Sequence, residues 1–283
     1  LLAGSSIRLS GNAEVDNGCM TQLVHTPEAL AKALPDGPIS LVPTMGALHG
    51  GHLALVRAAK ALGNPLVVSI FVNPLQFAPG EDLEKYPRTL AEDVEKLEAL
   101  GVDAVFAPSP ETIYPHGPRT TIQPGPLGEV LEGATRPTHF AGVLTVAAKL
   151  FALTSATDAF FGEKDYQQLA LIRQMVDDLH LPVRIHGCPI VRDTDGLALS
   201  SRNRYLSAEE RVTALAIPRA LATGSLSEAQ LLLDATEGLH LDYLVATAED
   251  MSELPDGYTG PARLLVAAKV GATRLLDNAA IEL

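Results

Sequence analysis

The chain has 283 residues, of which 47% are hydrophobic, and its formal net charge at pH 7 is −13. This apolar content is enough for a sizeable core in one large or two modest domains, and the negative charge argues against a broad nucleic-acid surface because it repels polyanions. The two cysteines, Cys19 and Cys188, are too few for a disulfide framework and form no C-x-x-C pair, which fits a reducing compartment. No apolar run reaches the roughly 18 residues that a membrane-spanning helix needs, so we expect no membrane partner.

The first residues predict no folded element. Residues 1–20 are rich in Gly, Ser and Asn and show no apolar period. They also lack the basic segment followed by a long apolar segment that is typical of a signal peptide. We expect residues 1–20 to be a tail or a cloning remnant.

From residue 39 onward, short apolar runs alternate with amphipathic stretches. The run PLVVSIFV at 65–72 is apolar throughout, which is typical of a strand buried on both faces. Thr89 and Glu92 have the spacing of a helix capping box, and Gly101 marks the end of that helix. The pattern predicts strands at 39–42, 65–72, 102–107, 156–161 and 182–186, and helices at 53–62, 89–100, 139–153 and 164–179.

This alternation predicts a Rossmann-like, doubly wound parallel sheet with covering helices over residues 21–190. After about residue 190 the pattern changes to helices followed by strands, which is typical of a separate α+β unit. We therefore expect a smaller second domain at 191–283, with helices at 208–221 and 227–236 and strands at 241–248, 262–269 and 273–283.

The first polar motif, PTMGALHGGH at 43–52, begins where a buried strand ends and finishes where a helix begins. Its glycines let backbone approach a ligand closely, and the helix N-terminus favours a phosphate. His49 and His52 could add hydrogen bonds or protons to a transferring phosphoryl group. A glycine-rich turn with two surface histidines, or a metal-binding pair, fits the same pattern.

Two further motifs follow strand ends. In FVNPLQF at 71–77, Asn73 and Gln76 could bind hydroxyls and a carboxylate, although a solvated proline turn is the commoner reading. In FGEKDYQQ at 161–168, Lys164 falls in the expected first helical turn, against the preference of the helix dipole. A nearby anion would explain that lysine, and Gln168 lies on the same helix face.

Two basic segments lie elsewhere in the chain. LSSRNR at 199–204 combines hydroxyl and guanidinium groups that suit phosphate, and RPTHF at 136–140 precedes a helix. Each is also compatible with a solvated loop or a helix cap. Because several motifs fall at the carboxyl ends of parallel strands, together they indicate a phosphate-handling enzyme.

These segments jointly resemble the pantothenate synthetase family. The matching strings are PTMGALHGGH, SIFVNPLQF, RPTHFAGVLTV, FFGEKDYQQL, DGLALSSRNRYLS and RLLDN, in one order from about residue 22 to the end. The histidine motif is the His-x-Gly-His signature of a nucleotidyltransferase superfamily, and the 200–202 stretch resembles its second signature loop.

The resemblance implies an ATP- and pantoate-binding Rossmann-like domain and a C-terminal lid domain. It implies that the pantoate carboxylate attacks ATP to give pantoyl adenylate and pyrophosphate, and that β-alanine then gives pantothenate and AMP. It also implies Mg²⁺ with the ATP and a cytoplasmic homodimer.

Residue roles are carried over by position. The resemblance implies catalytic roles on the phosphates for His49, His52, Lys164, Ser200, Ser201 and Arg202, with His52 as proton donor. It implies further nucleotide contacts from Pro43, Thr44, Met45, Gly46, Gly51, Gly162, Asp165, Val191 and Leu199. It implies pantoate or cavity-wall contacts from Asn73, Gln76, Arg136, His139 and Gln168, and metal contacts from Asp93 and Glu92.

The chain departs from the family pattern at three places. Leu199 stands where Met is frequent, a swap that similar size and polarity should make tolerable. Lys96 follows Glu92 and Asp93 by one turn and should weaken a direct metal contact. The stretch at 218–226 looks shorter than the family's lid helices.

Three rival functions remain at this point. A different nucleotidyl-transferring enzyme would share the histidine motif, although the net charge disfavours tRNA. A non-catalytic nucleotide-binding module would keep the fold without needing every His, Lys, Ser and Arg. A zinc hydrolase built on His49 and His52 lacks a third ligand at a recognisable spacing.

Overall fold

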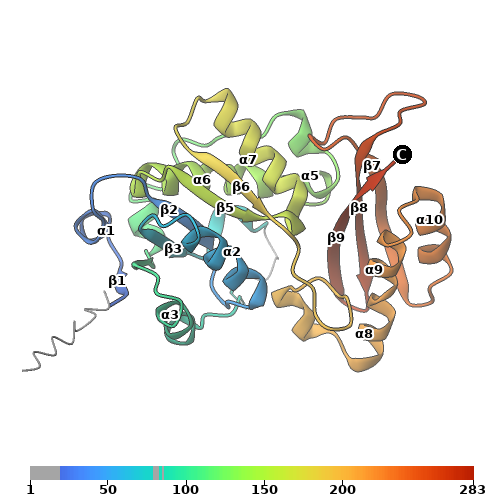
Figure 1. Cartoon of the computed structure of the whole chain (residues 1–283), viewed down its shortest axis with the longest axis horizontal. Helices are drawn as coiled ribbons and strands as arrows, with labels where there is room; N and C mark the ends of the chain where they lie inside the picture. The colour runs from blue at the N-terminus through green and yellow to red at the C-terminus, as the bar shows by residue number, and fades with distance from the viewer. Residues whose placement is uncertain (1–19, 79–82, 85) are drawn as a thin grey trace, which may run out of the picture.

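The computed structural model describes residues 20–78, 83–84 and 86–283 (Figure 1). The segment expected to be a tail lies, apart from Met20, outside the described residues, as does Cys19. In the part of the chain that the structure describes, no helix has both the length and the apolar character needed to cross a membrane.

A 6-stranded sheet has the order β1-β4-β3-β2-β5-β6, and its paired strands are all parallel. Its strands are β1 Gln22–Val24, β2 Ser40–Thr44, β3 Leu66–Ile70, β4 Ala104–Phe106, β5 Asp158–Gly162 and β6 Arg184–Cys188. The chain moves outward from β2 through β3 in one direction and through β5 and β6 in the other. The carboxyl ends of β2 and β5 therefore form the switch point at which such sheets bind ligands, and the predicted doubly wound class is confirmed.

The sheet is buried on both faces, as its apolar strands predicted. Leu41 and Val67 belong to one core cluster, whereas their neighbours Val42 and Val68 belong to the cluster on the opposite face. The first core also contains side chains of α1, α6 and α7, and the second contains side chains of α2 and α3. Figure 1 shows α6 and α7 on one side of the sheet and α2 and α3 on the other.

The helices around this sheet match most of the predicted segments. Their bounds are α1 Pro27–Ala33, α2 Gly50–Lys60, α3 Leu90–Glu98, α4 Pro110–Ile113, α5 Glu132–Thr135, α6 His139–Thr154 and α7 Tyr166–Asp178. Short 3-10 turns are η1 Pro74–Gln76, η2 Pro126–Glu129, η3 Glu163–Asp165 and η4 Ser201–Tyr205. The edge pair β1 and α1 was not predicted, because its residues are few and show no long apolar period.

Two local predictions are wrong. Thr89 precedes α3 but accepts no capping bond from a backbone N–H, because its backbone (φ −119°, ψ 41°) is not in the extended conformation of a capping residue. Its hydroxyl donates to the Asp93 carboxylate at 3.0 Å. The expected capping box with Glu92 is therefore absent. Lys164 lies in η3, a separate 3-10 turn before α7, and so does not occupy the first turn of the α-helix.

The C-terminal part is a 3-stranded antiparallel sheet in the order β7-β8-β9, as the change of pattern predicted. Its elements are α8 Ala208–Ala214, α9 Ala216–Leu221, α10 Leu226–Asp234, β7 Leu239–Thr247, β8 Pro261–Val270 and β9 Thr273–Glu282. The single helix predicted at 208–221 is divided at Leu215, because Pro218 has no N–H to donate to the carbonyl of Ala214.

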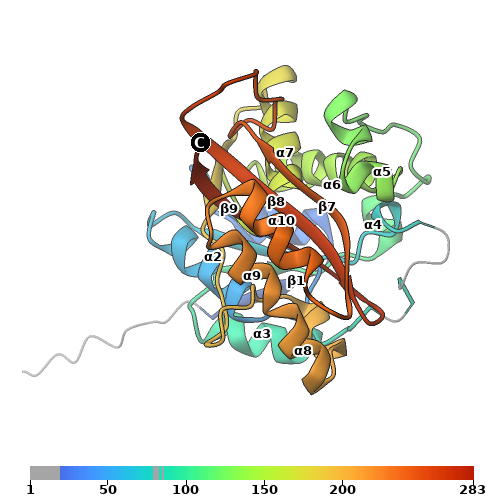
Figure 2. The same cartoon turned by 90° about the vertical axis from the view of Figure 1, so that its right-hand side faces the viewer.

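This second sheet has a different neighbour on each face. Leu264 and Val266 of β8 pack in a core with α9 and α10, which Figure 2 shows lying across the outer side of the sheet. Leu265, on the opposite face, packs with Tyr166 of α7. The C-terminal sheet is thus held between its own helices and the parallel-sheet part. The predicted boundary at residue 190 stays a prediction.

Candidate active site

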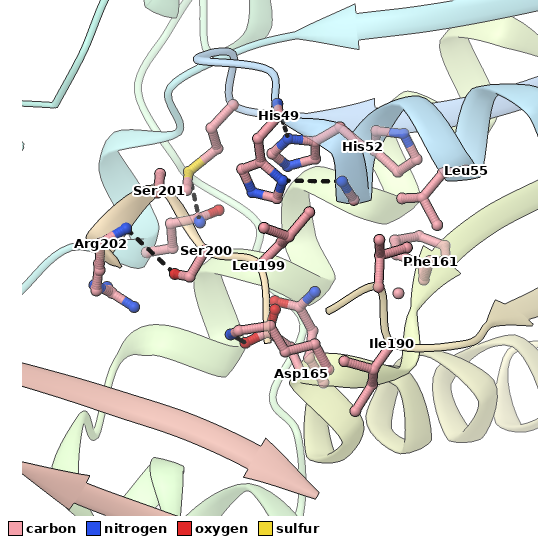
Figure 3. Close-up of a pocket in the computed structure, with 18 of the residues that line it drawn as sticks. His49, His52, Leu55, Phe161, Asp165, Ile190, Leu199, Ser200, Ser201 and Arg202 are labelled. Carbon is pink, nitrogen blue, oxygen red and sulfur yellow. Dashed lines mark hydrogen bonds and ion pairs between the residues drawn. The ribbon is translucent and has the colours of Figure 1, made fainter. Parts of the chain in front are cut away.

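A cavity of about 230 Å³ lies at the carboxyl ends of β2 and β5, the switch point of the sheet. The start of α2 supplies one wall, η1 and α6 supply a second, η3 a third, and the loop that enters η4 supplies the fourth. Figure 3 shows His49 and His52 on the α2 side, with Ser200, Ser201 and Arg202 on a separate segment next to them.

His49 and His52 fix the first turn of α2 through their own ring nitrogens. His49 Nδ1 accepts the backbone N–H of Gly51 at 3.2 Å, and His52 Nδ1 accepts the backbone N–H of His49 at 3.4 Å. A neutral imidazole that accepts at Nδ1 carries its proton on Nε2. Both rings therefore keep an Nε2–H group available as a hydrogen-bond donor.

Burial keeps these two rings neutral. Desolvation, with the positive charge of Lys164 as the next cause, lowers the pKa of His49 below its ordinary value. Desolvation and then the neighbouring His49 lower the pKa of His52 to about 3. The ring centroids are 4.1 Å apart, so two charged rings would repel each other strongly. At neutral pH the pair consists of neutral donors.

The loop between β2 and α2 is held by Asp93, whose side chain is fully buried (Figure 1 shows α3, which carries it). Its Oδ2 accepts the backbone N–H of Ala47 and its Oδ1 that of Leu48, both at 2.8 Å. Successive N–H groups that bend around an anion form a backbone nest. Gly46 and Ala47 both have positive φ there, at 85° and 51°. Since that region is unfavourable for Ala, Asp93 stabilises a strained turn just before His49.

The negative charge of the buried Asp93 carboxylate is already offset by hydrogen-bond donors and a nearby ammonium group of the protein. Thr89 donates a third hydrogen bond, and Lys96 Nζ lies 3.6 Å from Oδ1 while donating to the carbonyl of Leu48 at 3.1 Å. Glu92 is exposed on the same helix. Within residues 20–78, 83–84 and 86–283, no group of three or more His, Cys, Asp or Glu side chains could hold a metal ion. The residues present therefore do not fit a metal ion held by Asp93 and Glu92, and they offer no site for the zinc alternative.

Asn73, 1% exposed, organises the second wall from inside the protein. Its Oδ1 accepts from Leu75 N–H at 3.3 Å and from the Tyr114 hydroxyl at 2.9 Å. Its amide nitrogen donates to Gln76 Oε1 at 3.2 Å and to the carbonyl of Gly142 at 3.0 Å. These bonds use the hydrogen-bonding capacity of the amide, so Asn73 acts on the cavity through Gln76.

A close backbone approach places Gln76 at the cavity. A Cβ on Gly142 of α6 would lie 2.4 Å from the carbonyl oxygen of Leu75, so only glycine lets α6 and η1 pack this closely. Gln76 Nε2 lies 3.0 Å from the Met45 sulfur, and Arg136 Nη2 and His139 Nδ1 lie 3.1 and 3.0 Å from the Gln76 carbonyl oxygen. Arg136 and His139 thus anchor the backbone of Gln76 and complete the wall.

Cations gather at the cavity although the whole chain is acidic. Lys164, Arg136 and Arg202 line it, and Asp165 is the only carboxylate among the described lining residues. Lys164 Nζ lies 3.5 Å from Asp165 Oδ1. Desolvation inside the cavity opposes ionisation of Asp165, whose side chain is 49% exposed, but the charges of Lys164 and Arg202 hold its pKa below the ordinary value. This local field favours an anionic ligand.

The loop that enters η4 closes the fourth wall. Leu199 N–H donates to the carbonyl of Val191 at 2.9 Å, and Ser200 Oγ caps η4 by accepting Arg202 N–H at 3.3 Å. A Cβ on Gly50 would lie 3.1 Å from Leu199 Cδ1, which shows how closely Leu199 covers the start of α2. Figure 3 shows Leu199 lying between the histidines and Asp165.

The structure brings most of the predicted site residues to this one cavity. The predicted residues that line it are Pro43, Met45, His49, Gly51, His52, Gln76, Arg136, His139, Gly162, Lys164, Asp165, Gln168, Val191, Leu199, Ser200, Ser201 and Arg202. The residues that lie behind the lining are Thr44, Gly46, Asn73 and Asp93, whereas Glu92 is exposed on α3. Sequence reasoning missed the apolar lining residues Leu55, Phe77, Tyr86, Phe161, Ile190 and Tyr205. Of these, Phe77 and Phe161 could have been found, because they lie in the two motifs that follow predicted strands.

A cation-lined cavity at the switch point of a doubly wound sheet, with a glycine-rich turn and a helix N-terminus in its wall, defines an α/β enzyme that handles a phosphate-bearing ligand. The sequence model of the family described as Pantoate-beta-alanine ligase matches residues 20–280. The chain therefore belongs to the pantoate-beta-alanine ligase family.

Individual relatives agree with this assignment. The pantothenate synthetase of Corynebacterium jeikeium (strain K411) is 61% identical over 257 residues, which cover 87% of this chain and 83% of that protein. The crystal structure of pantothenate synthetase from Thermus thermophilus has a TM-score of 0.86 at 47% identity, covering 92% of this chain and 99% of that one. The pantoate-beta-alanine ligase of Francisella tularensis, solved with beta-gamma ATP and beta-alanine, has a TM-score of 0.79 at 36% identity, covering 92% and 97%.

Proposed function

We infer that this chain is an ATP-dependent ligase that joins pantoate to β-alanine, giving pantothenate, AMP and pyrophosphate. The observation that carries the inference is that one cavity gathers the paired histidines, Lys164 and the Ser200–Arg202 loop in a member of this family. The nucleotidyl-transfer and zinc-hydrolase rivals lack such support.

The reaction proceeds in two balanced steps. A pantoate carboxylate oxygen attacks the α-phosphorus of ATP. The bond between the α-phosphorus and the oxygen that joins it to the β-phosphorus breaks, and pyrophosphate leaves. The β-alanine amine then attacks the acyl carbon of pantoyl adenylate, AMP leaves with the acyl–oxygen bond electrons, and the amine loses a proton. Neither step needs a covalent bond to the protein, so positioning and charge stabilisation supply the catalysis.

We assign the two histidines to hydrogen bonding of phosphate oxygens. Their Nε2–H groups and the free N–H groups at the start of α2 suit charge that develops on the phosphates. Because the pKa of His52 is about 3, the ring holds no second proton at neutral pH. The sequence-based expectation that His52 donates a proton stays a prediction.

We assign Lys164 to neutralising charge around the α- and β-phosphates. Ser200, Ser201 and Arg202 bind the triphosphate from the C-terminal side of the cavity, where backbone, hydroxyl and guanidinium donors suit phosphate oxygens. We place the nucleotide against Pro43, Met45, Gly162 and Val191, which line the cavity.

We assign pantoate to the wall formed by Gln76 and Gln168. The buried Gln76 amide, fixed by Asn73 on one side and by Arg136 and His139 on the other, is preorganised to bind hydroxyl and carboxylate oxygens. Arg136 and His139 therefore position this substrate site.

Mg²⁺ enters this scheme with ATP, as part of the substrate. The buried and compensated Asp93 argues against a metal ion held by the protein there. A cytoplasmic homodimer and a domain boundary near residue 190 belong to the same proposal and rest on the family resemblance and on the two separate sheets.

The test is pyrophosphate release from ATP and Mg²⁺ with pantoate present and β-alanine absent, followed by addition of β-alanine. We expect a pantoate-dependent burst of about one equivalent per site that becomes steady turnover with AMP when β-alanine arrives. Lys164→Ala should lower the burst rate greatly while leaving the protein folded. A folded, ATP-binding sample that releases no pantoate-dependent pyrophosphate would overturn the proposal.

A further inference from the structure

The segment RLLDN at 274–278 of β9 belongs to the C-terminal sheet, yet its polar side chains reach beyond that sheet. Arg274 makes two hydrogen bonds of 2.7 Å to Glu132 of α5, and Asp277 accepts from Arg192 at 2.6 and 3.0 Å. Asn278 contacts η3, the turn that supplies one wall of the cavity. The segment therefore joins the C-terminal sheet to α5, to Arg192 and to one wall of the site.

Asn278, 2% exposed, binds the turn that carries Lys164. Its amide nitrogen donates to the carbonyl oxygens of Glu163 and of Lys164, both at 2.9 Å. Its Oδ1 accepts from Arg263 Nε at 2.8 Å. The orientation of the amide follows from its partners, because the carbonyls only accept and the guanidinium only donates.

These two carbonyls belong to the peptide units on either side of the Lys164 α-carbon. Holding both peptide planes fixes the backbone angles of Lys164 and so the direction in which its side chain starts. The residues that precede η3 and α7 do not cap them, because Gly162 has no side chain and the Asp165 side chain makes no capping bond. The η3 turn therefore receives this restraint from β9, which is more than a hundred residues later in the chain.

Arg263 supports the same arrangement. Its Nη2 lies 3.1 Å from Glu163 Oε2, and its guanidinium lies 4.1 Å from the centre of the Tyr166 ring. Arg263 of β8 thus holds Glu163 within η3 and Tyr166 just after it, while Asn278 holds the backbone of the turn.

We propose that Asn278 is a positioning residue for Lys164, which places the Lys164 ammonium at the reacting phosphates only while the C-terminal sheet is docked. The inference rests on the role assigned to Lys164 under the proposed function. A lysine side chain is long and rotatable, and Asp165 offers a competing partner at 3.5 Å. Fixing the backbone from which the side chain starts therefore decides how often the ammonium reaches the phosphates.

The decisive variant is Asn278→Asp, which keeps the shape and the acceptor to Arg263 but cannot donate to two carbonyls. We expect single-turnover pantoate-dependent pyrophosphate release to fall about 10- to 100-fold, since a misplacement of about 1 Å can change a rate by that much. Asn278→Ser, which retains one donor, should show an intermediate loss and serves if the Asp variant does not fold. Tyr243→Phe is the matched control, because it removes a hydrogen bond to Glu132 at the same interface without touching η3.

A double-mutant cycle separates positioning from general destabilisation. If Asn278 acts through Lys164, then adding Asn278→Asp to Lys164→Ala should change the residual rate by less than about twofold. The inference is overturned if Asn278→Asp releases pyrophosphate at the wild-type rate, or if Tyr243→Phe lowers that rate by the same factor as Asn278→Asp. It is also overturned if Asn278→Asp lowers the rate by its full factor in the Lys164→Ala background. A wild-type chain that releases no pantoate-dependent pyrophosphate would instead refute the proposed function.

Discussion

The carboxylate of Asp93 accepts the backbone N–H of Leu48 at 2.8 Å, immediately before the first histidine of the site. The two residues are 45 positions apart in the sequence, and α3 brings them together. A buried anion on one helix therefore holds the turn that begins another. This relationship assigns Asp93 a structural role where the family resemblance had implied a metal contact.

Replacing this carboxylate should disturb the histidines and leave the metal requirement unchanged. In Asp93→Asn, one amide oxygen cannot serve both N–H groups, and the amide NH₂ group faces a backbone donor. We expect a loss of about 2 kcal/mol in the free energy of unfolding and at least a tenfold lower adenylation rate. Urea unfolding and pantoate-dependent pyrophosphate release measure the two effects.

A Mg²⁺ titration of each variant provides the control. The concentration of Mg²⁺ that gives half-maximal rate should be the same in Asp93→Asn, Glu92→Gln and the wild type. A rise of tenfold or more in the Asp93 variant alone would mean that this carboxylate binds the metal after all, and our assignment would be wrong.

Much of the fold was predictable because its signals are local. The apolar run at Leu66–Ile70 and the amphipathic period of α7 each lie within one segment. The glycine-rich turn after β2 and Lys164 after β5 indicated a ligand site at the carboxyl ends of parallel strands. Contacts between distant residues were not predictable in this way. Thr89 has the sequence of a helix cap, but its backbone does not adopt the capping conformation, and its hydroxyl donates to the buried Asp93 carboxylate.

The same limit applies to the site. The resemblance predicted by position that His49, Lys164 and Arg202 belong to one site, and all three line one cavity. It did not predict the protonation state of the histidine rings or the contacts that support these side chains. Burial, which lowers the histidine pKa values, depends on how the whole sheet packs. Asn278 supports Lys164 through its side-chain amide and two backbone carbonyls, a contact that leaves no pattern in the sequence.

Gly51→Ala should separate stability from activity. Alanine is favoured over glycine inside a helix by about 1 kcal/mol, and Gly51 does not have a positive φ. Its new Cβ, however, would lie 2.9 Å from His49 Cε1, so the ring must move. We expect a protein that unfolds at the same or a higher temperature and catalyses adenylation at least tenfold more slowly.

Gly50→Ala is the matched comparison, since it lies in the same turn. Its Cβ would meet only the end of the flexible Leu199 side chain, at 3.1 Å. The loss of rate should therefore be smaller than for Gly51→Ala. Equal losses in the two variants would show that displacement of His49 is not the cause.

Leu199→Met should be nearly neutral, whereas Leu199→Ala should not. Leucine and methionine have similar volumes, and exchanges between them usually change stability by less than about 1.5 kcal/mol. Leu199 covers Gly50 at the start of α2, so truncation to alanine would open that contact to water. We expect the KM for ATP to rise several-fold in the alanine variant only. A similar rise in the methionine variant would contradict this reading of the loop.

His52 should make the protein less stable as the pH falls below about 6.5. The folded pKa of about 3 lies under the ordinary value of 6.5, so the unfolded chain binds one more proton between these limits. Stability is then fully present above pH 6.5 and should be lower by on the order of 1–2 kcal/mol at pH 5. Urea unfolding at pH 7 and pH 5 should show a smaller difference for His52→Gln. Equal differences in the two proteins would mean that His52 titrates normally.

Asp158 should make the stability of the protein depend on pH in a lower range than His52 does. It lies at the start of β5, at the opposite end of the strand from the cavity. Its buried carboxylate accepts from Arg184 at 2.9 and 3.0 Å and from His186 at 2.8 Å. The hydrogen bonds from Arg184, with burial opposing them, lower the pKa of Asp158 to about 2. Because this folded pKa lies below the ordinary value of 3.8, the stabilisation is present above pH 3.8 and is lost as the pH falls towards 2.

Asp158→Asn should unfold at a lower temperature than the wild type at pH 6, and the gap between the two melting temperatures should narrow at pH 3. A gap that stays constant from pH 6 to pH 3 would show that the carboxylate charge contributes nothing there.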